Sequence, residues 1–130
     1  MNKKSVIAAV VLVTFLATTF YLKTVLRRKD AVKTVNTILT HWKDGDLTLA
    51  MSYWKFPEES PPVYDLLSFE VGKGIVEKKD GVYQAYVPVK LEFPEGNQLP
   101  SGRKWSFRMA KTRYGWKITE FALSGDKPSP

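Results

Sequence analysis

The stretch VYQAYVPVKLEF, residues 82–93, is the clearest β-strand in the chain. Every second residue in it is apolar, and this set comprises Tyr83, Ala85, Val87, Val89, Leu91 and Phe93. Successive side chains of a strand point to opposite faces, so the pattern predicts a strand with one face against a core. Pro88 has no backbone N–H to donate, which predicts a sheet edge or a bulge at that position.

Similar alternation on both sides of this stretch predicts a meander of about four strands, at residues 68–78, 82–93, 104–111 and 116–123. Gly72 and Gly74 are expected to be bulges or bends in the first strand. The tripeptide Lys79-Asp80-Gly81 predicts a hairpin turn before the second strand. The alternation of the last strand slips between Ile118 and Phe121, which a bulge would accommodate.

Two helices are predicted before the sheet. The first carries apolar residues at steps of three and four, namely Ala31, Val35, Ile38, Leu39 and Trp42. Gly45 is expected to stop it, and Asp46 to cap a second helix from Leu47 to about Trp54. Three prolines in residues 56–62 predict a surface loop. The predicted fold class is therefore α+β, with a helical hairpin packed on a curved antiparallel sheet.

The amino-terminal region predicts a membrane anchor. Ser5 to Leu22 is a run of eighteen residues without a charged side chain, and its basic flanks are Lys3, Lys4, Lys23, Arg27, Arg28 and Lys29. As a helix it would be about 27 Å long, close to the thickness of a bilayer's hydrocarbon core. The alternative is a cleaved signal peptide, which the bulky residues after Ala17-Thr18-Thr19 disfavour. No glycine or proline separates the anchor from the first amphipathic helix, so the two are expected to be joined by a continuous or nearly continuous helix.

The predicted organisation is an anchor at residues 1–29, an α+β domain at residues 30–123 and a disordered tail at residues 124–130. Both flanks of the anchor are basic, so the positive-inside rule leaves its orientation open. A literal count favours a cytoplasmic domain, whereas a short basic start leading into an apolar run is typical of a signal anchor that exports the domain. We favour a single-pass membrane protein with the domain on the extracytoplasmic face.

The net charge of +7 does not indicate a nucleic-acid partner, because it is concentrated near the anchor. Six of the twenty Lys and Arg residues lie in residues 1–29, so residues 30–130 hold fourteen cations against thirteen anions. The most basic strand, residues 103–111, is better explained by alternation than by a nucleic-acid site. Its apolar residues Trp105, Phe107 and Met109 face the core in this interpretation, and Lys104, Ser106, Arg108 and Lys111 face water.

Four local motifs carry a family resemblance: His41-Trp42-Lys43-Asp44-Gly45-Asp46, Ala50-Met51-Ser52-Tyr53-Trp54, Trp105-Ser106-Phe107-Arg108 and Tyr114-Gly115-Trp116-Lys117-Ile118. With them, residues 30–123 resemble the nuclear-transport-factor-two-like superfamily of cystatin-like cones. The resemblance implies a cone with a pocket between helices and sheet, and often a homodimer formed through the sheets. An anchor followed by such a domain is also similar to assembly-factor domains of type IV secretion systems. Because the superfamily includes enzymes, ligand binders and interaction modules, the fold leaves the function open.

The candidates for catalysis are few. His41 is the only histidine and lies next to the apolar stripe, either as an acid or base at a pocket mouth or as a helix-end residue near the negative end of the helix dipole. Other candidates are Tyr64, Asp65, Glu70, Tyr83 and Tyr86, none of which stands in a recognisable enzyme motif. The inward face of residues 82–93 carries no acid. With no cysteine and one histidine, we expect no metal, no cofactor and no catalytic residues.

Two functions from different classes follow from the aromatic residues. In the first, the domain is a membrane-tethered interaction module, an accessory subunit or assembly factor of a membrane protein complex, with a partner-contact surface at Tyr53, Trp54, Phe56 and Tyr64. In the second, the cone binds or converts a small apolar molecule or lipid, with His41, Trp42, Trp105 and Trp116 as pocket candidates. The second predicts a cavity of some hundreds of Å³ inside the cone.

Overall fold

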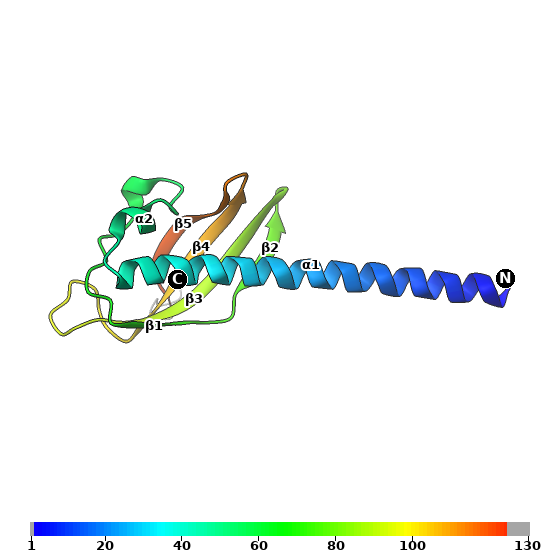
Figure 1. Ribbon diagram of the computed structural model, residues 1–130, viewed down its shortest axis with the longest axis horizontal. Coiled ribbons are helices and arrows are strands. Elements are labelled where there is room, and N and C mark those ends of the chain that lie inside the picture. The colour runs from blue at the N-terminus through cyan, green and yellow to red at the C-terminus, as the bar shows by residue number, and fades with distance from the viewer. Residues whose placement is uncertain (1, 125–130) are drawn as a thin grey trace, which may run out of the picture.

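The computed structural model describes residues 2–124 and shows an α+β fold (Figure 1). The helices are α1 (Lys3–Lys43), α2 (Leu47–Met51) and the 3₁₀ turn η1 (Pro57–Glu59). An open antiparallel sheet follows, with strands β1 (Ser68–Val71), β2 (Ile75–Lys79), β3 (Val82–Glu92), β4 (Arg103–Thr112) and β5 (Gly115–Leu123). The disordered tail predicted for residues 124–130 lies outside the described residues, apart from Ser124.

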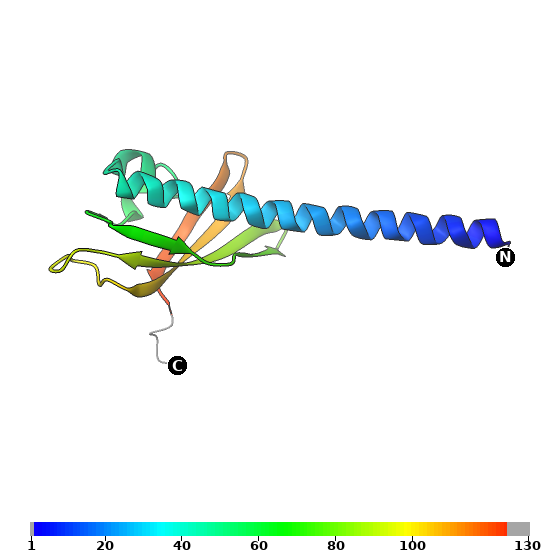
Figure 2. The ribbon, with the colours of Figure 1, turned by 60° about the horizontal axis from the view of Figure 1, so that its bottom comes forward.

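Helix α1 is continuous over 41 residues, as the lack of glycine and proline predicted. Its first half projects beyond the sheet, and its second half crosses one face of the sheet (Figures 1 and 2). The buried residues of α1 are the predicted stripe of Ala31, Val35, Ile38, Leu39 and Trp42. The stripe is therefore confirmed, and the apolar run before it is exposed.

The end of α1 follows the prediction, but the extent of α2 does not. Gly45 has φ +81°, a left-handed conformation that ends the helix, and the Asp46 side chain accepts a hydrogen bond from the Leu49 N–H at 3.3 Å. The predicted end near Trp54 is wrong, because α2 stops at Met51. Trp54 instead forms a parallel bridge with Ile118, whose N–H donates to the Tyr53 carbonyl at 2.7 Å.

The sheet has five strands rather than about four. The single strand predicted for residues 68–78 is divided into β1 and β2, which pair with different parts of β3. The break lies beside Pro88, whose carbonyl accepts a hydrogen bond from the Gly72 N–H at 2.7 Å. The nitrogen and carbonyl of one residue in an antiparallel strand point the same way, so the missing donor of Pro88 faces this break. Pro88 thus lies inside β3, and the irregularity is in the neighbouring strand.

The remaining sheet predictions concern turns and faces. Asp80 and Gly81 have φ of +52° and +79°, and they form the predicted tight turn between β2 and β3. Thr119 is the extra residue where the β4–β5 register shifts, which confirms the bulge between Ile118 and Phe121. Lys104, Arg108 and Lys111 are exposed as predicted, whereas Ser106 is buried. Ser106 pairs with Pro88 and Ala122 on neighbouring strands.

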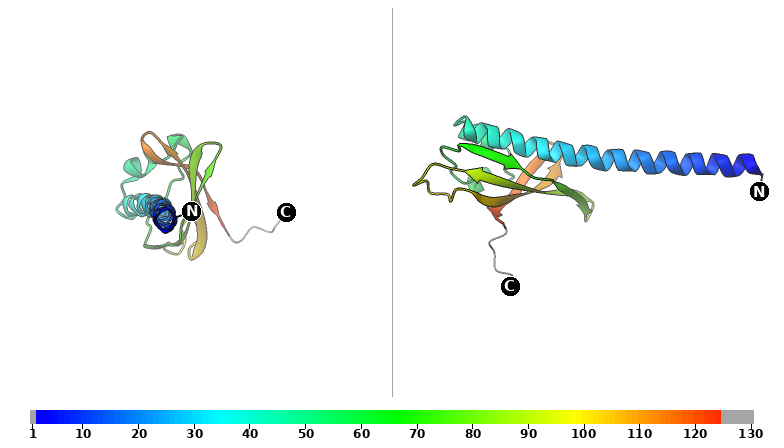
Figure 3. Two further views of the ribbon diagram at one scale, coloured as in Figure 1. Left: turned by 90° about the vertical axis from the view of Figure 1, so that its right-hand side faces the viewer. Right: turned by 90° about the horizontal axis from the view of Figure 1, so that it is seen from below.

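The fold has two layers, with α1 on one face of the sheet (Figure 3). The inner face of β3 carries the predicted core residues Ala85, Val87, Val89 and Leu91, which are all 5% exposed or less, as is Phe93 just after the strand. Tyr83, predicted on the same face, is half-buried. The largest fully buried side chains are Trp42 of α1 and Phe107 of β4. The core thus lies between α1 and the inner face, and no described helix covers the outer face (Figure 3).

Candidate functional site

The interior of the domain is filled by aromatic rings. The ring of Trp42 lies 5.4 Å from that of Trp54, 5.9 Å from that of Phe107 and 5.4 Å from that of Phe121, centroid to centroid. Trp105 stacks on Phe121 with the centroids 4.6 Å apart. The predicted pocket residues Trp42 and Trp105 therefore pack against other rings. Trp116, the third tryptophan among them, is also buried.

Two of these tryptophans carry an unpaired donor. The Nε1 atoms of Trp105 and Trp116 are buried and make no hydrogen bond to any described residue. A buried N–H without an acceptor destabilises the fold by about 1–3 kcal/mol, so each could gain from an acceptor that entered the core.

His41 lies in the last turn of α1 and is half-buried. Its ring centroid is 6.2 Å from that of Tyr53, and its backbone carbonyl accepts a hydrogen bond from the Asp46 N–H at 2.8 Å. A cationic side chain at this position would be stabilised by the carbonyl end of the helix. The contacts of His41 are thus those of a helix-end residue.

The other candidates for catalysis are scattered over the surface. Tyr64, Asp65 and Glu70 are exposed, and Tyr83 and Tyr86 are half-buried. Tyr83 has the Arg27 guanidinium over its ring at 4.0 Å. Ser106 is the only polar or charged residue buried among residues 2–124. Within the same range no three His, Cys, Asp or Glu side chains are grouped as a metal ion would require.

The predicted partner-contact residues do not all reach the surface. Trp54 is 4% exposed and belongs to the core, and Tyr53 packs against that core. Phe56 and Tyr64 are 48% and 54% exposed. The structure adds three exposed apolar residues from the same part of the chain, Leu49, Met51 and Leu67.

We call Leu49, Met51, Phe56, Tyr64 and Leu67 the distal apolar residues, because the segment that carries them begins at the end of α1 farthest from the amino-terminal apolar run (Figure 1). The exposure of Leu49 and Met51 was not predicted from the sequence, because the predicted helix from Leu47 to about Trp54 could have buried both side chains. The backbone around Tyr64 is held in place, since the Asn97 side chain donates a hydrogen bond to the Tyr64 carbonyl at 3.0 Å.

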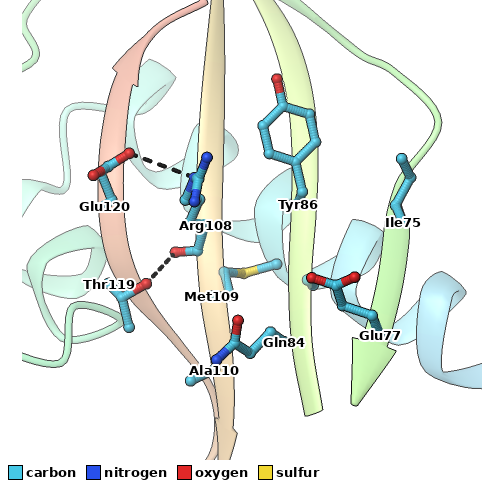
Figure 4. Close-up of a pocket in the computed structure, with 10 residues that line it drawn as sticks. Ile75, Glu77, Gln84, Tyr86, Arg108, Met109, Ala110, Thr119 and Glu120 are labelled. Carbon is cyan, nitrogen blue, oxygen red and sulfur yellow. Dashed lines mark hydrogen bonds and ion pairs between the residues drawn. The ribbon is translucent and has the colours of Figure 1, made fainter. Parts of the chain in front are cut away.

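A hollow of about 630 Å³ lies on the outer face of the sheet, away from α1 (Figure 4). Its lining is about half polar and includes Glu77, Gln84, Tyr86, Arg108 and Glu120. Arg108 and Glu120 form an exposed ion pair at 3.5 Å, from Nε to Oε1. The alternation predicted that Arg108 faces water but gave no sign of a hollow, which depends on how the sheet curves.

One structural finding is consistent with the predicted membrane span. Helix α1 contains a window that is long and apolar enough to cross a membrane, and none of that window is buried by the domain. Comparisons with protein-family models, curated proteins and solved structures find no match to this chain. The function must therefore be argued from the residues themselves.

Proposed function

We propose that the protein is a membrane-anchored, non-catalytic interaction module, a small accessory subunit or assembly factor of a membrane protein complex. The main observation in support of this proposal is the position of the exposed apolar side chains. Nine large apolar residues are exposed between residues 27 and 124, and the distal apolar residues are five of them. A protein partner that covered them would remove this apolar surface from water.

The anchor in this proposal is the first half of α1, inserted as a single span. Its exposed apolar side chains include Val10, Leu12, Phe15, Leu16 and Phe20, which the domain leaves in contact with solvent. A bilayer would bury them, and the flanking cations would lie among the lipid headgroups. We place the domain on the extracytoplasmic face, because the short basic start leads directly into the apolar run.

The absence of catalysis is part of the proposal, and the filled interior supports it. Enzymes place acids or bases in partly desolvated sites, whereas Asp65 and Glu70 are exposed and His41 lies at a helix end. A long helix across a curved antiparallel sheet also supports membership of the nuclear-transport-factor-two-like superfamily. The uncovered outer face, with Tyr86, Arg108 and Glu120, is where a second copy would pack in a homodimer.

One observation favours the alternative, the binding or conversion of an apolar ligand or lipid in the cone. The unpaired indole N–H groups of Trp105 and Trp116 could donate to a ligand acceptor. Such a ligand would have to displace rings that now pack at centroid distances of 4.6–6.1 Å. We therefore rank the interaction module first.

The test is to extract the tagged full-length protein from native membranes in mild detergent. Mass spectrometry then identifies the proteins and small molecules that copurify. We expect a stoichiometric protein partner that is lost in the double variant Phe56→Ser/Tyr64→Ser. The matched control is Tyr114→Ser, which removes an aromatic side chain 78% exposed on the β4–β5 turn and should keep the partner.

Each other outcome counts against a stated part of the proposal. Recovery of the protein alone with a bound apolar molecule would establish the alternative. A partner retained by the Phe56→Ser/Tyr64→Ser variant would remove the distal apolar residues as the contact surface. Release of the full-length protein from membranes without detergent would contradict the anchor.

A further inference from the structure

A groove of about 480 Å³ runs between α1 and the segment that separates β1 from β2. Its lining includes Arg28, Lys29, Val32 and Lys33 of α1, together with Lys73 and Gly74 of the segment. Gly74 allows the two walls to meet, because a Cβ at this position would lie 2.9 Å from Cγ2 of Val32. The groove thus has a closed apolar base at Val32 and Gly74, with cations along its walls.

The charge of this groove is uncompensated. Four cations line it and no carboxylate does. None of the four forms an ion pair within residues 2–124, whereas Lys111 of β4 is paired with Asp30 of α1 at 3.2 Å. Unpaired cations on both walls of one groove create a positive potential that selects an anionic ligand.

The groove opens close to the end of the apolar run. Arg28 follows Leu22 by six residues, which places it about 9 Å farther along the helix axis. The headgroup layer beyond the hydrocarbon core is roughly 5–8 Å thick on each side of a bilayer. The turn between β2 and β3 lies at a similar height, since Tyr83 contacts Arg27. With the anchor inserted up to Leu22, the groove begins at the outer edge of the headgroup layer.

We infer that this groove binds the phosphate-bearing headgroup of an anionic phospholipid from the membrane that holds the anchor. The cations provide charge complementarity from two walls, and Val32 offers an apolar contact for the glycerol end of the lipid. With the anchor inserted, the end of the groove at Arg28 lies nearest the bilayer, so lipid headgroups are the anionic groups closest to it. The inference rests on the proposed anchor and is independent of the proposed protein partner.

The test uses the full-length protein in detergent micelles that contain equal amounts of phosphatidylglycerol and phosphatidylcholine. Native mass spectrometry counts the lipids of each kind that the protein retains. We expect preferential retention of phosphatidylglycerol, and a loss of at least about tenfold in the triple variant Arg28→Gln/Lys33→Gln/Lys73→Gln. The control Lys43→Gln/Lys55→Gln/Arg113→Gln makes the same change in net charge away from the groove and should retain the lipid.

Two further measurements isolate the groove and the source of the phosphate. Lys73→Gln alone changes an exposed loop residue and should reduce retention in part, so the test does not depend on the folding of the triple variant. Excess inorganic phosphate should leave the lipid bound. Displacement by phosphate, equal retention of the two lipids, or undiminished retention in the triple variant would each overturn the inference.

The same samples separate this inference from the proposed function. A protein that needs detergent but shows no lipid preference would contradict the groove and leave the anchor standing. A protein that remains soluble without detergent would contradict the anchor, and with it the lipid site. Neither result depends on the Phe56→Ser/Tyr64→Ser variant, which tests the partner.

Discussion

At the scale of single residues, Trp42 is the side chain that joins α1 to the sheet. It is 1% exposed, and its ring lies near those of Trp54, Phe107 and Phe121, which come from three other parts of the chain. A large buried aromatic residue contributes through the apolar area that it removes from water and through its close packing.

Trp42→Ala should destabilise the domain by about 3–5 kcal/mol, because it leaves a cavity in the aromatic core. Urea unfolding of the full-length protein in detergent, followed by near-ultraviolet circular dichroism, would measure the change. Tyr114→Ala is the matched control and should shift the unfolding free energy by no more than about 0.5 kcal/mol. Similar losses in the two variants would mean that the core is not organised around Trp42.

Gly74 is a second residue whose replacement has a defined steric result. An alanine Cβ would press on the Val32 side chain, and such overpacking costs about 1–3 kcal/mol. Val32→Ala removes the methyl group involved, so the double variant Gly74→Ala/Val32→Ala should recover part of the loss. A double-mutant cycle of urea unfolding measures this coupling, and strict additivity would contradict the close approach.

Among the helices and strands, the features that the sequence predicts correctly are mainly those that depend on the spacing of apolar residues. The buried stripe of α1, the inner face of β3 and the bulge at Thr119 follow directly from apolar spacing, and the turn at Gly81 follows from its residue types. The end of α2 could not be predicted in this way, because Trp54 is drawn away by Ile118, which is 64 residues later in the chain. The division of β1 from β2 similarly depends on Pro88 in another strand.

Contacts between residues far apart in the sequence also explain why only some of the predicted partner-contact residues are exposed. Phe56 and Tyr64 are exposed, as a partner-contact surface requires, because the proline-rich loop keeps them away from the core. Trp54 belongs to the same run of sequence, but its long-range bridge to β5 buries it. The groove beside α1 could not be predicted from the sequence either, because tertiary packing brings Lys73 next to Arg28 and Lys33.

The continuity of α1 is an element-scale property that can be tested. Thr24 is exposed and lies before Ala31, the first buried residue of the stripe, so Thr24→Pro should break the helix without unfolding the domain. The chain has no cysteine, which allows spin labels at Ser5→Cys and Tyr114→Cys.

Pulsed electron paramagnetic resonance should give a narrow distribution of distances between the labels in the parent protein, and a broad one with Thr24→Pro. The Thr24→Ala control should remain narrow. A distribution that is already broad in the parent would contradict a continuous helix.

At the scale of the whole molecule, the chain has two dissimilar ends. The exposed apolar run, which is the proposed anchor, and its cations are at one end of α1, and the segment with the distal apolar residues begins at the other (Figure 1). Between them the domain has its own core, whose contribution from α1 starts at Ala31. The anchor should therefore be separable from the domain.

A protein that begins at Lys23 should be soluble and folded without detergent, because every core residue is retained. A protein that begins at Asp30 should fold too, but with a free energy of unfolding lower by about 0.5–1 kcal/mol, since it lacks the cation–π contact of Arg27 with Tyr83. Analytical ultracentrifugation and urea unfolding would measure both. Aggregation of the Lys23 form would show that the apolar half of α1 is needed for the fold.

In the proposed membrane-anchored arrangement, the uninterrupted α1 would also couple the position of the domain to the thickness of the bilayer. Membrane helices tilt by about 20° on average, and a longer apolar stretch tilts further in a thinner membrane. From Leu22 to Lys43 the helix extends by about 32 Å, so a tilt of about 20° would move its far end sideways by about 11 Å. Membrane thickness would then determine where Phe56 and Tyr64 stand over the bilayer, and hence which neighbouring proteins they can reach.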